Sequence, residues 1–225
     1  MIQTFVSYVQ KKNGQPPKVA NATPEPDTTP MPEPGGWGLT REPFTLCADP
    51  EMLYLGAGHR DALARLLYAV RTHKGGALLV SEDAGDGKTS LLRRLLLDLA
   101  VPGAPPVLSA FIEYPTLTPT QMLRAIATGL GAPKALRDKA TAVASLREHL
   151  LAHRATGGVA VVVVDEGQLL ADRTAVLQEL RILLNLSTPE GFLLTFLLSG
   201  QKPLMAAVKA IPELWQRLPV RIFLD

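Results

Sequence analysis

A short stretch of the chain combines residue types that bind phosphate. Residues 78–100 read LLVSEDAGDGKTSLLRRLLLDLA, an apolar run followed by a turn with glycines, Gly-Lys-Thr and a leucine-rich segment. Glycines in such a turn let backbone N–H groups approach phosphate oxygens at unusual dihedral angles. The lysine can reach the β- and γ-phosphates of a nucleotide, and the threonine hydroxyl can ligate Mg²⁺. The predicted ATP-binding residues are Ala84, Gly85, Asp86, Gly87, Lys88, Thr89 and Ser90.

Three carboxylates distinguish this loop from the usual pattern. Glu82 stands where the pattern has its first glycine, and Asp83 and Asp86 follow inside the loop. At an effective dielectric constant near 20 and a separation of about 8 Å, each carboxylate costs roughly 1–2 kcal/mol of phosphate binding before salt screening. Two interpretations stay open: a working nucleotide site of lowered affinity, or a decayed loop that keeps the fold without the nucleotide.

Two adjacent acidic residues end a second apolar segment, VVVVDEGQ. Ligands of parallel sheets bind at the carboxyl ends of the strands. We therefore expect Asp165 to hold Mg²⁺ together with Thr89, and Glu166 to polarise the water that attacks the nucleotide.

Three polar residues that follow later apolar segments are further candidates for the reaction. Gln201 ends FLLSGQ, where it is placed to sense the γ-phosphate or to cap the next helix. Arg217 and Arg221 are either surface charges or arginines that reach the nucleotide of a neighbouring subunit. Arginines that act on a neighbour imply a homo-oligomer, a ring or a filament if the contact is head-to-tail.

The elements that must position these residues alternate along the chain. Apolar runs predict strands over residues 76–81, 106–113, 159–166, 192–201 and 220–224. Helical spacing predicts helices over residues 59–70, 118–130, 141–155, 173–186 and 202–211, with another beginning near Lys88. Strands that are apolar throughout belong to a parallel sheet covered on both faces. The predicted fold class is therefore α/β, a central parallel sheet flanked by helices in three layers.

Composition limits the classes of function. The 225 residues carry a formal net charge of +2, which does not indicate a nucleic-acid or membrane surface. Cys47 is the only cysteine, so an intramolecular disulfide is excluded, and we interpret it as a plain thiol rather than a nucleophile. No apolar run has the length of a membrane span, and the first residues do not resemble a secretory signal. A cytoplasmic location without a transmembrane segment is expected.

The sequence divides into two parts. Residues 14–36 are rich in proline, threonine and acidic residues, and residues 1–36 are therefore predicted to form a disordered tail. Its first dozen residues carry the apolar side chains of Ile2, Phe5, Val6, Tyr8 and Val9, and either dock on a protein partner or form a frayed terminus. Residues 37–225 are expected to form one folded domain.

Several ordered segments resemble the ExeA-type AAA+ ATPases, the family of general secretion pathway protein A. The resemblance rests on EDAGDGKTSLLRRLL, on DEGQLLADRTAVLQELRILLNLST, and on LLSGQKPL and PELWQRLPVRI. It covers about residue 37 to the C-terminus and implies a P-loop NTPase with an AAA+ core that binds and hydrolyses ATP. The family has alanine where this chain has Gly167. AAA+ proteins usually continue into a helical lid, which is expected to be missing here, so hydrolysis is expected to be slow or partner-dependent.

Three functions are consistent with these observations. The leading hypothesis is an ATPase that drives or regulates a macromolecular assembly, such as a secretion or envelope complex. A second hypothesis is a scaffold that keeps the fold and acts as an interaction module. A third, which we do not favour, is an accessory ATPase that binds DNA, as relatives in transposition systems do; its candidate contacts are Arg93, Arg94, Lys202 and Lys209.

Overall fold

A computed structural model describes residues 50, 53–133 and 138–224. The tail predicted over residues 1–36, its apolar tip and Cys47 lie outside the described residues. Within the described ranges, no helix combines the length and the apolarity needed to cross a bilayer.

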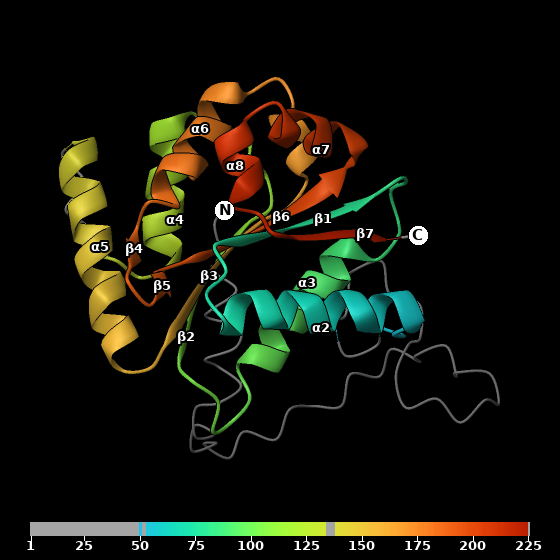
Figure 1. Ribbon diagram of the computed structural model, residues 1–225, viewed down its shortest axis with the longest axis horizontal. Coiled ribbons are helices and arrows are strands. Elements are labelled where there is room, and N and C mark those ends of the chain that lie inside the picture. The colour runs from blue at the N-terminus through green and yellow to red at the C-terminus, as the bar shows by residue number, and fades with distance from the viewer. Residues whose placement is uncertain (1–49, 51–52, 134–137, 225) are drawn as a thin grey trace, which may run out of the picture.

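A five-stranded parallel sheet forms the centre of the molecule (Figure 1). Its spatial order is β2 (Val107–Ile112), β3 (Val159–Val164), β6 (Thr195–Gln201), β1 (Gly76–Ser81) and β7 (Val220–Leu224). β1 therefore pairs on one side with β6 and on the other with β7, both of which come from the last part of the chain. Every residue of β1 and of β3 is buried, which explains why both read as uninterrupted apolar runs.

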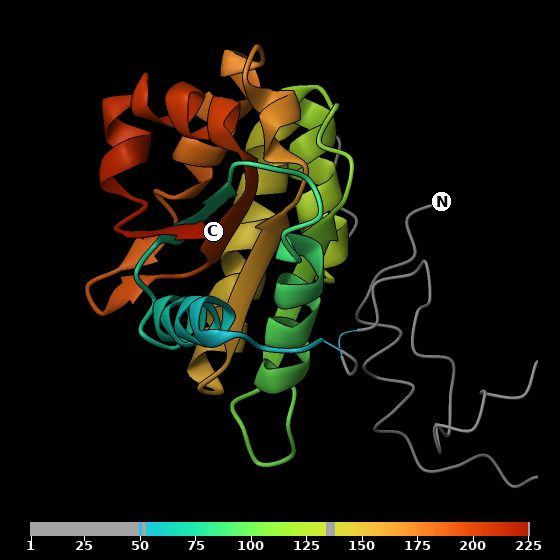
Figure 2. The ribbon, with the colours of Figure 1, turned by 90° about the vertical axis from the view of Figure 1, so that its right-hand side faces the viewer.

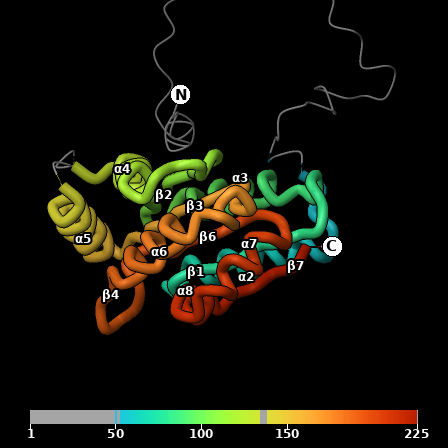
Figure 3. The backbone as a smooth tube through the Cα atoms, turned by 90° about the horizontal axis from the view of Figure 1, so that it is seen from above, coloured from blue at the N-terminus to red at the C-terminus, as the bar shows by residue number. Residues whose placement is uncertain are grey.

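Helices cover both faces of the sheet, as predicted. α2 (Ala57–Arg71) and α3 (Lys88–Leu99) lie on one face. The other face carries α4 (Pro119–Gly129), α5 (Lys139–Ala155), α6 (Thr174–Leu183), α7 (Lys202–Lys209) and α8 (Pro212–Gln216). Figure 2 shows α2 end-on beneath the sheet with α7 and α8 above it, and Figure 3 shows α5 at the end of the molecule opposite β7. The three-layer α/β fold class is confirmed.

Alternating strand residues build two separate cores. Leu78 and Val80 of β1 pack into the core beneath α4 to α8, whereas Ala77 and Leu79 pack against α2 and α3. This alternation is the ordinary consequence of strand geometry, in which neighbouring side chains point to opposite faces. Apolar side chains therefore cover both faces of the sheet. The polar side chains that line the pocket lie where strands end.

The strand expected over residues 192–201 is divided in two. β5 (Gly191–Phe192) pairs antiparallel with β4 (Ser187–Thr188), and β6 begins at Thr195. Between them the Leu193 N–H donates to the carbonyl of Leu186 at 2.9 Å, so Leu193 belongs to neither ladder of the central sheet. The prediction was too long because an apolar run does not show where a strand changes its pairing partner.

Two short helices were absent from the sequence prediction. A 3₁₀-helix, η1 (Gly167–Leu170), follows the acidic residues after β3, and α8 begins at Pro212, with two residues between it and the end of α7. Proline suits the first turn of a helix because it lacks only an N–H that would have no partner there. Helices of four or five residues are too short to show a hydrophobic period in the sequence.

Candidate functional site

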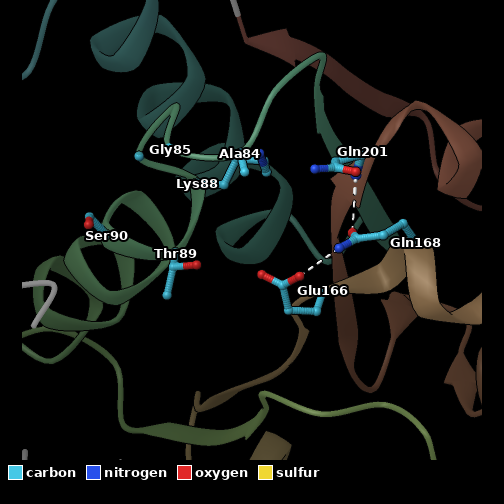
Figure 4. A pocket seen from close by; sticks show the side chains of 9 residues that line it. Ala84, Gly85, Lys88, Thr89, Ser90, Glu166, Gln168 and Gln201 are labelled. Atoms are coloured by element: carbon cyan, nitrogen blue, oxygen red, sulfur yellow. Dashed lines mark hydrogen bonds between the residues drawn. The ribbon is translucent and has the colours of Figure 1, made fainter.

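All the predicted nucleotide-binding residues except Asp86 line one pocket at the carboxyl edge of the sheet. β1, β3 and β6 end at this edge, and the loop of residues 82–87 leads from β1 into α3 (Figure 4). The pocket has a volume of about 220 Å³. Its lining residues are Ala84, Gly85, Gly87, Lys88, Thr89, Ser90, Glu166, Gln168 and Gln201. The structure thus brings together residues that the sequence places more than a hundred positions apart.

The loop has the backbone geometry of an anion site. Gly85 has a φ of 98° and Gly87 a φ of 75°, both in the left-handed region that side chains disfavour. Gly87 is the N-cap of α3, so the positive end of that helix faces the pocket. His59 of α2 supports the loop from outside, since its Nε2 lies 3.0 Å from the carbonyl oxygen of Asp86.

Lys88 is held within the loop. Its ammonium group donates to the carbonyl oxygen of Asp83 at 2.9 Å and to the hydroxyl of Ser81, which is the last residue of β1. Both acceptors are neutral, so the positive charge of Lys88 is not cancelled and is available to an anion. Ser81 is fully buried and fixes the lysine at the strand end.

The three loop carboxylates do not line the pocket. Glu82 forms an ion pair with Lys202, the first residue of α7. Its φ is not positive, so replacing the pattern's glycine with glutamate does not strain the backbone here. The Asp86 carboxylate accepts the N–H of Asp83 at 3.3 Å and is therefore turned back onto the loop. Asp86, which the sequence predicts as a nucleotide-binding residue, is not among the residues that line the pocket.

Asp165 and Thr89 form the oxygen-rich part of the site. The Thr89 hydroxyl donates to Oδ2 of Asp165 at 2.5 Å. Asp165 is only 4% exposed, and both residues also line an adjoining hollow of about 380 Å³. Mg²⁺ prefers few protein ligands that are hard oxygens, and completes its shell with water and phosphate oxygens. A hydroxyl beside a buried carboxylate fits that requirement, and the described residues contain no larger cluster of metal-ligating side chains.

Glu166 has an unusual backbone conformation and a defined side-chain partner. Its φ is 51° and its ψ 34°, a left-handed conformation that costs a residue with a Cβ about 1 kcal/mol or more. Figure 4 shows its carboxylate pointing into the space between Thr89 and Gln168. Nε2 of Gln168 donates to Oε2 of Glu166 at 2.5 Å, and Oε1 of Gln168 accepts the N–H of Gln201 at 3.3 Å.

The two candidate arginines lie away from the pocket of their own chain. Arg217 donates from Nη1 to the carbonyl oxygen of Arg181 at 2.9 Å. Arg221 lies over the ring of Trp215, with its guanidinium carbon 3.6 Å from the ring centroid, and donates to the carbonyl oxygen of Trp215 at 2.7 Å. Neither arginine lines the pocket, so a role in a neighbouring subunit stays a prediction.

Sequence reasoning missed four residues that shape this site, namely Ser81, His59, Gln168 and Lys202. Gln168 carried a usable signal, because it is a polar residue two positions after Glu166 in a segment that follows a buried strand. Lys202 had been considered only as a DNA contact. The partners of Ser81 and His59 depend on how the loop folds and had no signal in the sequence.

Comparison with known proteins agrees with this geometry. A family model described as an AAA domain matches residues 71–207. General secretion pathway protein A of Aeromonas hydrophila is 37% identical over 194 residues, which cover 84% of this chain and 34% of that protein. The chain thus spans about a third of the length of this curated relative.

Solved structures of low sequence identity share the fold. The ORC2 protein of Aeropyrum pernix in its ADP form has a TM-score of 0.58 and 16% identity, covering 76% of this chain and 48% of that one. The ORC1 protein of the same organism, in complex with DNA, has a TM-score of 0.55 and 21% identity, covering 78% of this chain and 47% of that one. From the family match and the shared fold, we conclude that the chain belongs to the AAA domain family and has its P-loop α/β architecture.

Proposed function

We propose that the protein binds ATP with Mg²⁺ and hydrolyses it to ADP and phosphate. The observation that carries the proposal is the hydrogen bond between Thr89 and Asp165, which joins the phosphate loop to the end of β3. Lys88, Thr89 and Glu166 line the pocket, and Thr89, Asp165 and Glu166 line the adjoining hollow. A structural core has no need of these four side chains at one strand edge.

Each group has a defined task in this proposal. The N–H groups of the loop and the ammonium of Lys88 bind the phosphates. Thr89 and Asp165 hold Mg²⁺, which supplies neutralisation of charge on the phosphate oxygens. Glu166 accepts a hydrogen bond from the attacking water and takes up its proton as the new oxygen–phosphorus bond forms, while the bond from the γ-phosphorus to the bridging oxygen breaks and ADP leaves. Gln201 ends β6, lines the same pocket as Glu166 and orients the water or the phosphate.

The acidic loop is compatible with this function. Glu82 is paired with a lysine, and Asp86 is satisfied by the loop backbone. The repulsion expected from three free carboxylates is therefore reduced, although Asp83 remains exposed. We expect the affinity for ATP to be lowered relative to a loop without these acids, but not lost.

Titration with a fluorescent ATP analogue in the presence of Mg²⁺, followed by phosphate release, tests the proposal. Lys88→Ala should lower the affinity for the analogue about tenfold or more, because a charge-assisted hydrogen bond is lost. Glu166→Gln should keep binding but lower turnover at least about 100-fold. Lys74→Ala, an exposed lysine outside the pocket, is the matched control. Equal binding by the parent and Lys88→Ala, or equal turnover by the parent and Glu166→Gln, would contradict the proposal.

We further propose that the protein acts as a homo-oligomer, a ring or a filament, in which Arg217 or Arg221 completes the pocket of a neighbour. Its support is that neither arginine lines the pocket of its own chain. Mixing inactive Lys88→Ala with an inactive arginine variant should restore turnover, because one subunit supplies the nucleotide site and the other the arginine. Wild-type turnover by both Arg217→Ala and Arg221→Ala would rule this out.

We infer that the energy of hydrolysis serves a macromolecular assembly of the cell envelope or of secretion, with the domain on the cytoplasmic side. The support is the similarity to general secretion pathway protein A, which covers about a third of that relative. Glu166→Gln, which retains ATP, should co-purify with an envelope complex from its own cells, and Lys88→Ala should not. Equal recovery of both variants with the envelope fraction would count against this role.

A further inference from the structure

The side-chain amide of Gln168 bridges two parts of the pocket. Its Nε2 donates to the Glu166 carboxylate at 2.5 Å, and its Oε1 accepts the backbone N–H of Gln201 at 3.3 Å (Figure 4). A carboxylate can only accept and a backbone N–H can only donate. The two partners therefore fix which end of the amide faces which way, and the amide cannot flip without losing both hydrogen bonds.

Two glycines make this bridge sterically feasible. A Cβ added to Gly200 would lie 2.8 Å from Oε1 of Gln168, and one added to Gly167 would lie 2.8 Å from the carbonyl oxygen of Ser199. Neither glycine has a positive φ, so glycine is needed here for close approach and not for backbone conformation. The missing side chains allow η1 to lie directly on the end of β6, and this contact carries Gln168 to its place.

Glu166 depends on such a partner for its orientation. Its side chain is exposed at the pocket edge, and its backbone is in the left-handed region at the junction between β3 and η1. An exposed glutamate samples several rotamers unless a hydrogen bond selects one. A carboxylate that must take a proton from water in a fixed position loses much of its effect when it is misplaced by about 1 Å.

We propose that Gln168 is a positioning residue for the hydrolysis of ATP. Its side chain holds the Glu166 carboxylate in a fixed position relative to the end of β6. The inference rests on the proposed function, because it concerns the step that Glu166 performs. Gln168 acts through Glu166 and the Gln201 backbone and takes up no proton itself. It therefore contributes to the rate at which bound ATP is hydrolysed, and not to the affinity for ATP.

Two substitutions separate positioning of Glu166 from support of β6. Gln168→Met keeps the length of the side chain and removes both hydrogen bonds. Gln168→Glu keeps an acceptor for the Gln201 N–H but cannot donate to Glu166 when ionised. Gln216→Met, an exposed glutamine on α8, is the matched control for the substitution. Thermal unfolding of each variant shows that the fold is kept.

Steady-state hydrolysis at saturating ATP, with binding of the fluorescent analogue, tests the proposal. Both Gln168 variants should lower kcat at least about tenfold, whereas Gln168→Met should change the affinity for the analogue less than about threefold. A kcat of Gln168→Glu close to that of the parent would show that only the bond to Gln201 matters, and would overturn the proposal. A raised kcat in Gln168→Met, or a rise in KM with unchanged kcat, would also overturn it.

Comparison with Glu166→Gln separates this inference from the proposed function. If the parent turns over ATP and Glu166→Gln does not, the proposed function stands, and the Gln168 variants then decide the inference alone. If the turnover of the parent does not depend on Glu166, the proposed function fails and the positioning role of Gln168 fails with it.

Discussion

Lys202 and Glu82 form an ion pair between residues that are 120 positions apart in the chain. Glu82 begins the phosphate loop after β1, and Lys202 begins α7 after β6. The two side chains are half exposed or more, so the pair adds little to the stability of the fold. Its effect is local: it holds the Glu82 carboxylate against Lys202 of α7 and supplies a compensating positive charge.

Removing Lys202 should weaken nucleotide binding. An uncompensated carboxylate about 8 Å from the phosphates costs roughly 2 kcal/mol at an effective dielectric constant of 20, and solvent screening lowers this to about 1 kcal/mol. We expect Lys202→Ala to lower the affinity for the ATP analogue about threefold to fivefold, and by less at high salt. Glu82→Ala/Lys202→Ala should bind like the parent. If the double variant binds as weakly as Lys202→Ala alone, Lys202 contacts the nucleotide directly and compensation is the wrong explanation.

Replacing Gly167 with alanine should destabilise this chain. The added Cβ would lie 2.7 Å from Cδ2 of Leu204 and 2.8 Å from the carbonyl oxygen of Ser199. Moving η1 away from β6 to relieve this overlap should cost about 1–3 kcal/mol of the free energy of unfolding, measured by urea denaturation. Gly58→Ala is the control, since a Cβ on Gly58 meets no atom within 4 Å. Equal midpoints for Gly167→Ala and the parent would show that η1 adjusts without cost.

The start of α4 should depend on its capping box. The Thr118 side chain accepts the Gln121 N–H at 3.3 Å, and the Gln121 side chain accepts the Thr118 N–H at 2.9 Å. Thr118→Ala removes one of these hydrogen bonds and should lower the free energy of unfolding by about 1 kcal/mol. Thr120 is the second residue of the helix, and Thr120→Ala should be neutral or slightly stabilising because alanine favours helices. A smaller loss for Thr118→Ala than for Thr120→Ala would contradict the assignment of the cap.

Protonation of His73 should oppose folding. Burial, with a smaller contribution from the positive charge of Arg154, lowers the pKa of His73 below its ordinary value of 6.5. The unfolded chain then binds the proton more readily, so the free energy of unfolding should fall as the pH drops below about 6.5. His73 has a φ of 52°, which asparagine tolerates. In His73→Asn the free energy of unfolding should therefore depend less on pH in this range. An unchanged slope would show that other groups cause the pH dependence.

The strands that end at the pocket were predictable because their burial is uniform. All residues of β1 and β3 are buried, so each strand appears as an apolar run that stops where polar residues begin. The change of partner near Leu193 left no trace in the sequence, because the residues remain apolar through it: Phe192 is half-buried, and Leu193 and Leu194 are buried. Local sequence carries information on burial and conformation, but not on which strand lies alongside.

The pocket was predictable to the extent that its residues lie in local motifs. Gly85, Lys88 and Thr89 follow one strand, and Glu166 follows another, so their convergence depends only on strand order. The partners of Glu82 and of Gln168 depend on contacts across the sheet edge, 120 and 33 positions away in the chain. Such contacts follow from the packing of η1 and α7 on β6, which no local pattern records.

The position of β1 between β6 and β7 has a consequence for biosynthesis. The strand that leads into the phosphate loop leaves the ribosome with neither of its hydrogen-bonding neighbours, since both are encoded by the last part of the chain. At ordinary rates of translation the delay is on the order of ten seconds. During that time an apolar strand with two unpaired edges is exposed, which is the kind of segment that nascent-chain chaperones protect from aggregation. The proposed ATP site should therefore be among the last parts of the domain to form in the cell.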